Sequence, residues 1–502
     1  ENAEITTYLE QSITSELSGN VIDLCPVGAL TSKPYQFKAR PWELKRTDSI
    51  DIFDSVGSNI RVDSRAEEIL RVTPRTNEYI NEEWISDKVR FNYDGYYQQR
   101  IDTPYIKENQ KLSISNWEES LKVLKDKLKT LKPLALIGEH VDLETGYAIK
   151  KFMSNYGKDN VECRTDNHAI LESLDSYRFN TPLNDIENSD LIILLGTNPK
   201  IETPIINHKI FKAYNNDAKV FNIGENISLN YKTEYLGESL PSLNNENLIK
   251  ALKKSTNPLI IIGSAFLNKI KNIKTLKSIF SYADKYKVIT KEKNNLNFLN
   301  PYASRVGQLI IGNTTNNLCE PFSNLKKDNF ELVLSFGSEH IANEQFNNCF
   351  KVYFGHHGDD GAMGSDIVLP TPLYTEKNGT FVNIEGRPQE AKKCHNPIGS
   401  AKEEWSILKK LSDELSFDFT PNTFDQLRSE LFDKYPILSD YHEIIAVENS
   451  TSITPDIEFE DCKAEYPVSN FYMSDVISKN SVTMAKCVEE IISTPSLLEK
   501  SA

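Results

Sequence analysis

The sequence contains seven cysteines but no Cys-x-x-Cys pair. They are odd in number and scattered: Cys25, Cys163, Cys319, Cys349, Cys394, Cys462 and Cys487. This spacing excludes a disulfide framework and a zinc site built from neighbouring ligands. A reducing compartment is the simplest setting for such a chain. For every cysteine except Cys25, a small buried side chain is the favoured interpretation.

Long apolar segments and clustered positive charge are also missing. No apolar run approaches the roughly 20 residues that a membrane helix needs, and the longest, at 191–196 and 258–263, are predicted to be buried strands. The net charge of −15 argues against binding nucleic acid or an anionic membrane surface, because both need clustered Lys and Arg. We therefore expect neither a nucleic-acid partner nor a direct membrane span. The chain begins at Glu1 rather than Met, so the removal of a targeting segment stays open.

No nucleotide-binding fingerprint is present, neither a G-x-G-x-x-G at a strand–helix junction nor a Walker sequence. Three glycine-containing stretches follow predicted strands, at 196–199, 263–265 and 355–361. Ligands bind at the carboxyl ends of strands in doubly wound sheets, so these stretches are candidate sites. A tight turn that needs small residues explains each of them at least as well.

The third stretch contains two adjacent histidines, His356 and His357. Neighbouring side chains on an extended segment point opposite ways, which favours hydrogen-bonded structural histidines over a shared metal ion. Asp359 and Asp360 follow and could form a carboxylate site, but no nucleophile or orienting partner is identifiable.

The most suggestive stretch lies at 21–30 and reads Val-Ile-Asp-Leu-Cys-Pro-Val-Gly-Ala-Leu. A cysteine followed by proline and a glycine-containing turn is a recurring way to end an iron–sulfur ligand set. The proline fixes the backbone, and the glycine lets the chain approach a bulky cofactor. Cys25 therefore has three interpretations: an orphan, a buried structural thiol, or the last ligand of a set that lies elsewhere.

The apolar pattern predicts an α/β fold. Period-two alternation at 49–53 and 59–63, with a third strand at 69–72, indicates a small antiparallel β unit. From residue 114 onward, fully apolar strands alternate with helices, as in a parallel sheet covered on both faces. The pattern restarts at 259–263, which indicates two successive doubly wound units.

The two ends of the chain are predicted to be helical. Helices are expected at 2–17, 402–415, 424–435 and 471–492, with an acidic surface linker at 445–465. The aromatic cluster at 93–97 is assigned to surface packing.

A longer motif at 365–389 carries a family resemblance. It reads Asp-Ile-Val-Leu-Pro, then Glu-Lys-Asn-Gly-Thr-Phe-Val-Asn-Ile-Glu-Gly-Arg-Pro-Gln. It resembles the signature of molybdopterin-dependent oxidoreductases, in which it helps to build the cofactor pocket. The resemblance implies doubly wound units of the molybdopterin-oxidoreductase type.

A more specific resemblance covers nearly the whole chain. The segments at 18–35, 80–88, 355–359, 471–478 and 483–488 are similar to the 75-kilodalton iron–sulfur subunits of respiratory complex I, in family order. This implies a non-catalytic core subunit that scaffolds the peripheral arm at the matrix side of the mitochondrial inner membrane. It also implies partner subunits, including the flavin subunit, within an NADH:ubiquinone reductase that translocates protons.

The resemblance also implies a role for Cys25. It matches the fourth ligand of a [4Fe–4S] cluster whose other three cysteines belong to an upstream Cys-x-x-Cys-x-x-Cys run that this sequence does not contain. We expect the cluster to be shared with an upstream region or a second chain. The subunit is then either truncated at its N-terminus or split, with a separate polypeptide bringing the missing cysteines.

Two other cofactor sites are expected to be lost. Positions that hold a further [4Fe–4S] cluster in some relatives match Asp51, Asp54, Ser58 and Ser86, and oxygen ligands do not replace thiolates on iron–sulfur units. No molybdopterin is expected either. Active relatives place the metal-coordinating side chain near 163–180. This sequence has Asp166, His168 and Ser173 there, and none of the three can be assigned as the ligand.

These inferences divide the chain into five expected regions. They are the end of the [4Fe–4S] ferredoxin-like region at 1–43, a cluster-less small β domain at 44–100, Rossmann-like units at 101–255 and 256–400, and a helical C-terminal region at 401–502. Two alternative functions stay open: a catalytic molybdopterin oxidoreductase of the formate dehydrogenase kind, and a purely structural accessory subunit. The first is disfavoured by the oxygen side chains where an electron-exit cluster would be needed.

Overall fold

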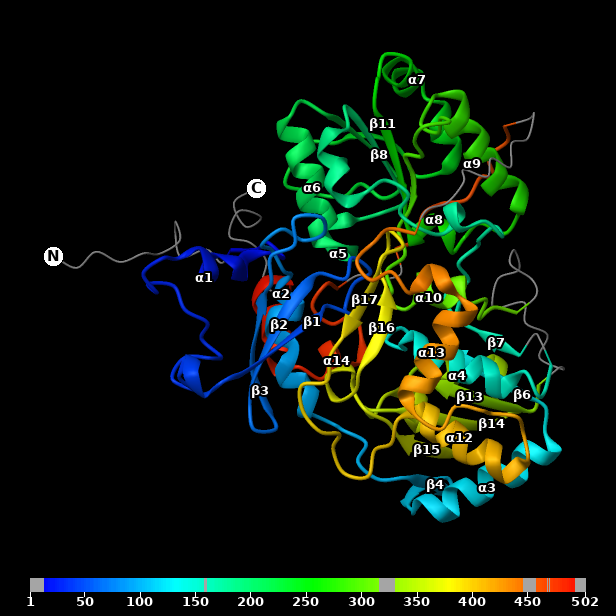
Figure 1. Ribbon diagram of the computed structural model, residues 1–502. Coiled ribbons are helices and arrows are strands. Elements are labelled where there is room, and N and C mark those ends of the chain that lie inside the picture. The colour runs from blue at the N-terminus through cyan, green and yellow to red at the C-terminus, as the bar shows by residue number, and fades with distance from the viewer. Residues whose placement is uncertain are drawn as a thin grey trace.

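The computed structural model describes residues 13–157, 160–315, 330–445, 457–466, 468 and 470–492. A small antiparallel sheet lies beside two larger units, each built on a parallel sheet (Figure 1). Within the described residues, no helix is both long and apolar enough to cross a membrane. The expected helix at 2–17 and linker at 445–465 fall largely outside the described residues.

The small sheet has the order β1-β2-β3 and is antiparallel throughout. Its strands are β1 (Lys45–Ile50), β2 (Asn59–Arg65) and β3 (Glu68–Pro74). The first strand was expected at 49–53, but it ends before Asp51. The Asp51 carboxylate accepts the backbone N–H of Phe53 at 2.8 Å and so closes a turn. The helix α2 (Asp87–Phe91) packs against this sheet.

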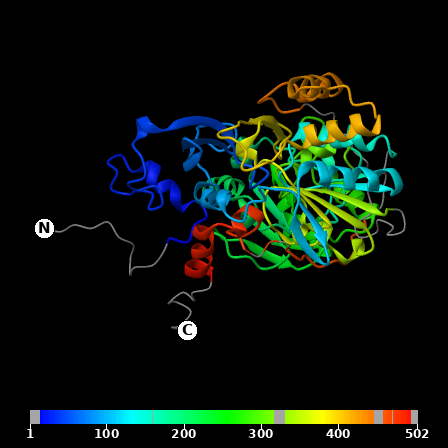
Figure 2. The same ribbon diagram turned by 90° about the horizontal axis from the view of Figure 1, so that it is seen from below.

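The larger sheet has seven strands in the order β5-β4-β15-β14-β13-β6-β7. Five of them run parallel, and β4 and β5 add an antiparallel edge. The strands are β4 (Tyr105–Glu108), β5 (Lys111–Ile114), β6 (Pro133–Ile137), β7 (Val161–Glu162), β13 (Leu332–Phe336), β14 (Phe350–Gly355) and β15 (Ile367–Pro370). The helices α3 (Trp117–Thr130) and α4 (Leu143–Met153) contact this sheet, and α12 (Glu404–Leu415) and α13 (Phe424–Lys434) form the outer layer over them (Figure 2).

The second large sheet is entirely parallel, with the order β10-β9-β8-β11-β12. Its strands are β8 (Leu191–Leu195), β9 (Lys219–Ile223), β10 (Glu234–Gly237), β11 (Pro258–Ile262) and β12 (Leu296–Phe298). The central strands β8 and β11 are buried along their whole length, as their apolar sequences predict. The helices around it include α6 (Pro204–Asn215) and α9 (Ile273–Lys285).

The two parallel sheets do not follow the expected division at residue 255. The five-stranded sheet uses strands from 191 to 298, and the seven-stranded sheet combines strands before and after it. The pairing of β6 with β13 joins segments almost 200 residues apart. The sequence pattern marks each strand but not its neighbours, because parallel strands pair across long connections.

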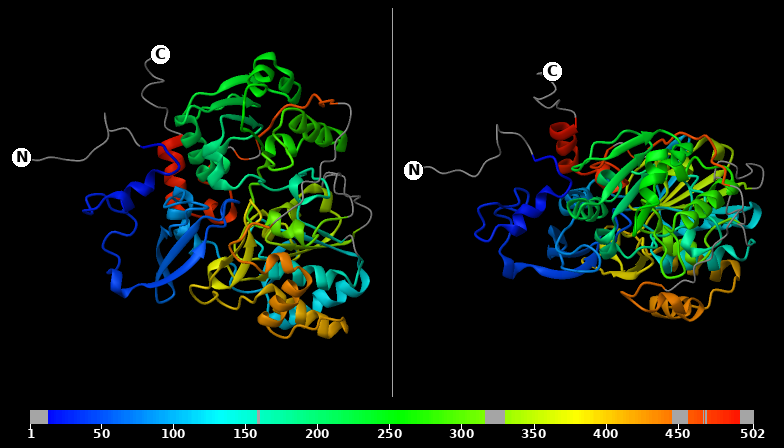
Figure 3. Two further views of the ribbon diagram at one scale, coloured as in Figure 1. Left: turned by 45° about the horizontal axis from the view of Figure 1, so that its top comes forward. Right: turned by 90° about the horizontal axis from the view of Figure 1, so that it is seen from above.

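The C-terminal segment is also more broken than expected. In place of one helix at 471–492, the chain forms α14 (Val476–Lys479), α15 (Val482–Cys487) and a wider turn at 488–492. Asp475 and Ser481 cap the two short helices. The Asp94 carboxylate accepts the backbone N–H of Thr483 at 2.9 Å, so the C-terminal helices lie against the small β domain (Figure 3).

Candidate functional site

Cys25 lies at the end of the short helix α1 (Val21–Leu24), in an extended conformation. The backbone N–H of Leu30 points at its Sγ, at 3.4 Å. Gly28 has φ +67°, which turns the loop so that several N–H groups face the sulfur. The N–H groups of Leu30, Val27, Ala29 and Gly28 lower the pKa of the Cys25 thiol. The loop therefore favours the thiolate, which is the form that binds metal.

The segment before Cys25 is fixed to the helix α2. Gly19 N–H donates to an Asp87 carboxylate oxygen at 2.7 Å, and the Asn20 amide donates to the Ile85 carbonyl at 2.8 Å. Arg90 forms an ion pair with Asp23 at 2.6 Å. A side chain on Gly19 would meet the Arg90 side chain at 2.6 Å, so only glycine permits this approach. The Cys25 loop is thus positioned by the small β domain.

Several large apolar side chains in the segment from residue 24 to 42 are exposed. Val27 is 83% exposed, Phe37 97% and Trp42 80%, whereas single surface apolar residues elsewhere are mostly less exposed. Leu24, next to Cys25, is 54% exposed. A segment with this many exposed apolar side chains is a candidate interaction surface.

The four positions at which some relatives are expected to hold a further [4Fe–4S] cluster are buried in the small β domain. Asp51, Asp54, Ser58 and Ser86 are each at most 2% exposed. Asp54 accepts the N–H of Val56 at 2.9 Å, and Ser86 caps α2. Burial and the neighbouring Asp54 raise the pKa of Asp51 well above its ordinary range. These side chains shape turns and a helix start, and their oxygens do not suit an iron–sulfur unit.

The remaining cysteines lack the features of the Cys25 loop. Cys163 and Cys394 are buried, Cys349, Cys462 and Cys487 are half-buried, and Cys319 lies outside the described residues. Burial raises the pKa of Cys163 to about 12 and that of Cys394, Cys462 and Cys487 to about 11. Among the described residues, no three or more His, Cys, Asp or Glu side chains are arranged so that they could hold a metal ion.

A cavity of about 480 Å³ lies where the carboxyl ends of both parallel sheets face each other. This is the edge at which doubly wound folds bind ligands. Strands of the seven-stranded sheet lead to Glu139, Asp166 and Glu339, and strands of the five-stranded sheet lead to Glu202, Asn268 and Tyr302. Lys88, Asp475 and Lys479 close the cavity from the small domain and the C-terminal segment.

The lining of this cavity does not suit a molybdopterin cofactor. Five carboxyl groups line it against two lysines, and the phosphates of such a cofactor need cationic groups and N–H donors. Asp166 is committed to an ion pair with Arg305 at 2.9 Å. His168 is buried with a pKa lowered to about 3 by burial, and neither it nor Ser173 lines the cavity. None of the three side chains is placed as a molybdenum ligand.

Glu139 provides a test of the electrostatics of this cavity. Burial, and then the nearby carboxylates, raise its pKa to about 8. The folded state therefore binds more protons than the unfolded state from about pH 4.5 to 8, and stability falls as the pH rises through this window. We expect Glu139→Gln to make the free energy of unfolding fall less steeply with pH, by up to about 1.4 kcal/mol per pH unit. Urea unfolding at pH 5.5 and pH 8 measures this free energy, and Glu246→Gln on the exposed surface is the control. If E139Q lost as much stability between the two pH values as the unsubstituted protein, the raised pKa of Glu139 would be contradicted.

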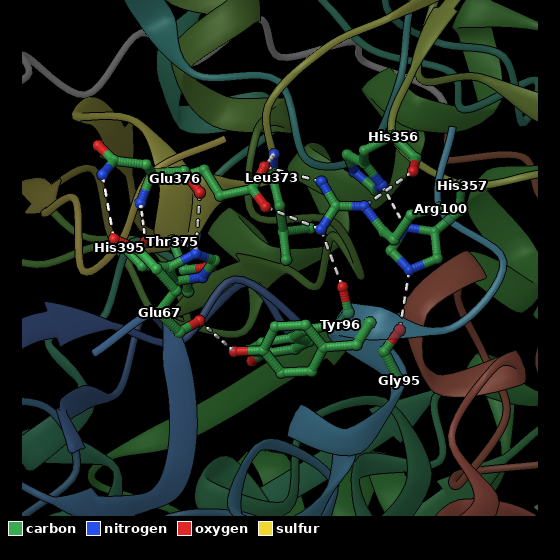
Figure 4. A network of polar contacts seen from close by, with 12 residues as sticks. Glu67, Gly95, Tyr96, Arg100, His356, His357, Leu373, Thr375, Glu376 and His395 are labelled. Carbon is green, nitrogen blue, oxygen red and sulfur yellow. Dashed lines mark hydrogen bonds and ion pairs between the residues drawn. The ribbon is translucent and has the colours of Figure 1, made fainter. Parts of the chain in front are cut away.

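The paired histidines belong to a buried polar network rather than to the cavity (Figure 4). Their Nδ1 atoms lie 2.6 Å apart, so the prediction that they point opposite ways is wrong. His357 Nε2 contacts the Gly95 carbonyl at 2.9 Å, and Arg100 binds Glu376 through two contacts of 2.8 and 2.7 Å. Nearby, Asp359 caps a short helix through the N–H of Ala362. These groups join the small β domain to the seven-stranded unit.

Comparisons with known proteins match four parts of the chain. Residues 44–94 match the NADH-ubiquinone oxidoreductase NDSU1/NuoG-like 4Fe-4S domain, and residues 1–31 match the ferredoxin-like domain of NADH-quinone oxidoreductase subunit 3. Residues 446–487 match the C-terminal domain of NuoG-type NADH-ubiquinone oxidoreductase subunits, and residues 100–414 match molybdopterin oxidoreductase. The NuoG-type NADH-quinone oxidoreductase subunit of Rickettsia bellii is 41% identical over 500 residues, which is 97% of this chain and 72% of the relative. The chain belongs to the NuoG family.

Similar proteins include one that is named as mitochondrial. The mitochondrial NADH-ubiquinone oxidoreductase 78 kDa subunit of Candida albicans is 37% identical over 511 residues, covering 97% of this chain and 70% of the relative. The NADH-ubiquinone oxidoreductase 75 kDa subunit of Reclinomonas americana is 38% identical over 518 residues, covering 97% of this chain and 74% of the relative. Acetylene hydratase from Pelobacter acetylenicus shares the fold, with a TM-score of 0.59 and 11% identity over 80% of this chain and 74% of the other. The family and the α/β fold class predicted from the sequence are confirmed. The ferredoxin-like match at 1–31 includes Cys25 and agrees with the expected iron–sulfur character, whereas the 4Fe-4S match at 44–94 covers the domain with oxygen side chains at 51, 54, 58 and 86.

Sequence reasoning missed most of the cavity-lining groups. Of the three strand-end stretches considered as candidate sites, those at 196–199 and 263–265 lead into the cavity, through Glu202 and Asn268, and the one at 355–361 does not line it. The missed groups carry a comparable signal, because Gly138-Glu139-His140 and Gly337-Ser338-Glu339-His340 each follow a fully buried, mainly apolar strand.

Proposed function

We propose that this chain is a non-catalytic core subunit of respiratory complex I that helps to hold a [4Fe–4S] cluster between NADH and ubiquinone. The observation that carries the proposal is the Cys25 loop, in which backbone N–H groups stabilise a partly exposed thiolate. Cys25 supplies one ligand, and an upstream region or a second polypeptide supplies three. The bound cluster carries one electron at a time.

The residues around Cys25 set the properties of that ligand. The N–H groups of residues 27 to 30 offset negative charge on Sγ, and hydrogen bonds to cluster sulfurs are one of the means by which proteins tune reduction potential. The contacts of Gly19 and Asn20 with the α2 region hold the loop in position. If Cys25 were mobile, the geometry of the bound cluster would vary. The contacts that fix the loop therefore favour electron transfer.

The exposed apolar side chains of Leu24, Val27, Phe37 and Trp42, in the segment that contains Cys25, support a partner that covers this segment. We assign this face to the polypeptide that brings the remaining cysteines, so that the cluster and an apolar interface join the two. Other subunits of the peripheral arm, including the flavin subunit, are further partners. The subunit acts as part of a proton-translocating NADH:ubiquinone reductase, on the matrix side of the mitochondrial inner membrane.

Substitution of Trp42 tests this arrangement. Loss of a central aromatic contact weakens an interface by roughly 2 kcal/mol or more, which is about thirtyfold in affinity. When the chain carries an affinity tag and is purified, the polypeptide with the Cys-x-x-Cys-x-x-Cys run should be recovered with it. We expect Trp42→Asp to reduce this recovery, in line with a thirtyfold loss of affinity. Ile437→Asp is the matched control, because Ile437 is 51% exposed on a different part of the surface. Unchanged recovery in W42D, or no such polypeptide in the assembly, would contradict the two-chain arrangement.

Two alternatives are less well supported. A catalytic molybdopterin oxidoreductase would need phosphate-binding groups where Glu139, Asp166 and Glu202 line the cavity. A purely structural accessory subunit would have no use for a loop that lowers the pKa of one partly exposed thiol while burial raises those of the five other described cysteines. Metal analysis with stoichiometric molybdenum would favour the first alternative.

A further inference from the structure

A second cleft, of about 880 Å³, lies at the edge of the five-stranded sheet. Asn188 and Asn257 line it just before β8 and β11 begin, whereas the cavity between the sheets lies at the carboxyl ends of these strands. The lining also follows the edge strand β12, because the Asn180 amide donates to the Leu296 carbonyl at 2.7 Å. The cleft shares no lining residue with the cavity between the sheets.

A buried cation without a carboxylate partner lines this cleft. Arg178 is 7% exposed and forms no ion pair with a carboxylate of the described residues. Its Nε donates to the Asn180 side-chain oxygen at 3.0 Å, and its Nη1 donates to the Ile445 carbonyl at 2.6 Å. Its Nη2 donates to no described residue, and it is not closed off from solvent. Because buried charges are normally paired, this guanidinium marks a place for an anion.

The carboxylates nearest to Arg178 do not compensate for its burial. Burial lowers the pKa of Arg178 below its ordinary value, although Asp175 and Glu385 act in the opposite direction. The Glu385 carboxylate is already engaged, since Arg387 lies 2.8 Å from it. An oxyanion in contact with Arg178 would supply the missing opposite charge.

Two lysines add positive charge to the cleft. Lys293 is half-buried, and its Nζ donates to the Asn257 side-chain oxygen, whereas Lys291 is exposed and pairs with no carboxylate of the described residues. The lining therefore has three cations against the carboxyl groups of Asp185 and Glu292. The surrounding sequence is more strongly basic, because residues 250–293 contain eleven lysines and two acidic residues in a chain of net charge −15. Such a local excess of positive charge attracts anions.

Amide and hydroxyl side chains fix the wall between these cations. Thr181 Oγ1 donates to Asn295 Oδ1 at 3.2 Å, and Asn295 Nδ2 donates to Asn257 Oδ1 at 3.0 Å. The same Asn257 oxygen accepts from Lys293. Since Thr181 lies three residues after Arg178, these contacts link the segments that carry the two cations. Groups that are ordered before binding lose little entropy on binding.

We propose that this cleft binds a small phosphate monoester with a polar body, with Arg178 as the main contact of the phosphate. A guanidinium presents its N–H groups in a plane that matches phosphate oxygens. A phosphate monoester carries nearly two negative charges at neutral pH, so it gains more than a carboxylate from several cations. No aromatic side chain of the described residues lines the cleft, which favours a hydroxylated body over a stacked ring. The inference does not depend on the cluster at Cys25.

Binding of glucose 6-phosphate to the full chain, measured by isothermal titration calorimetry, tests the proposal. Gluconate carries a carboxylate on a similar hydroxylated body, and glucose carries no charge. We expect glucose 6-phosphate to bind at least about tenfold more tightly than either. Inorganic phosphate lacks the polar body and should also bind more weakly.

Substitution of the cleft cations locates the binding. Arg178→Gln should weaken glucose 6-phosphate binding about tenfold or more, because a hydrogen bond to a charged group is lost. Lys293→Gln should weaken it about threefold, since this cation is only partly buried. Lys253→Gln is the matched control, because Lys253 is exposed in the same basic region and does not line the cleft. This variant should bind as the unsubstituted chain does.

Each outcome decides the proposal. Gluconate or inorganic phosphate that binds as tightly as glucose 6-phosphate would overturn it, and so would the absence of binding by all of them. Unchanged affinity in folded R178Q and K293Q, or an equal loss in K253Q, would also overturn it, because the binding would then lie elsewhere or depend on net charge alone. Circular dichroism establishes folding, and K293Q carries the test if R178Q does not fold.

Discussion

Replacing Cys25 with serine is expected to remove one [4Fe–4S] signal from the electron paramagnetic resonance spectrum of the assembled complex. The serine oxygen is a hard ligand and does not replace a thiolate on an iron–sulfur unit. The N–H groups that stabilise negative charge on Sγ would then surround a neutral hydroxyl. We expect the iron content of the complex to fall and electron transfer from NADH to ubiquinone to stop.

Cys462→Ser is the matched control for this substitution. Cys462 is half-buried, as Cys25 is, but it packs beside the core of the five-stranded sheet, and burial raises its pKa to about 11. The C462S complex should keep every cluster signal and its full iron content. A C25S complex with an unchanged spectrum would favour the purely structural alternative.

Removing the Glu376 carboxylate is expected to have the largest effect on stability. Its two oxygens bind the Arg100 guanidinium at 2.8 and 2.7 Å, and both side chains are almost fully buried, at 0% and 4% exposure (Figure 4). Breaking a buried pair by removing one partner leaves an uncompensated charge and costs about 3–5 kcal/mol. We expect Glu376→Ala to lower the free energy of unfolding by this amount, measured by guanidinium denaturation.

An exposed ion pair provides the comparison for E376A. Glu246 lies 3.5 Å from Lys250, with side chains that are 88% and 70% exposed. Such pairs contribute about 0–1 kcal/mol, so Glu246→Ala should leave the denaturation midpoint almost unchanged. Similar losses in the two variants would contradict the structural role of the Arg100–Glu376 pair. A double variant, Arg100→Met with Glu376→Met, should recover part of the loss because no unpaired charge stays buried.

Individual strands could be predicted from the sequence because their burial leaves a strong local pattern. The strands β8 and β11 are apolar at every position and are found within a residue of the expected ranges. Their arrangement into sheets could not be predicted in the same way. The pairing of β6 with β13 depends on contacts between distant segments, which a local pattern does not record.

Contacts with distant segments also explain why the aromatic cluster at 93–97 was predicted at the surface. It was expected at the surface, but Tyr96 is fully buried and its hydroxyl lies 2.7 Å from that of Tyr374. The partner stands 278 residues away along the chain. An aromatic residue in a short irregular segment carries no periodicity, so its burial depends on a partner that the local sequence does not reveal.

The Cys25 loop was predictable because its chemistry is encoded within ten residues. The proline, the glycine with positive φ and the converging N–H groups all lie between residues 25 and 30. The cavity was not predictable in this way, because its lining residues follow strand ends in two different sheets. Sites on one loop leave a motif, whereas sites assembled across sheets leave only scattered polar residues after apolar strands.

The most direct measurement is a cryo-electron microscopy map of the assembled complex at the Cys25 loop. The account predicts continuous density from Sγ of Cys25 to an iron atom of a [4Fe–4S] cluster, with three further thiolates from outside these 502 residues. It also predicts protein density against Val27, Phe37 and Trp42. A free Sγ with no iron at bonding distance would contradict the central claim.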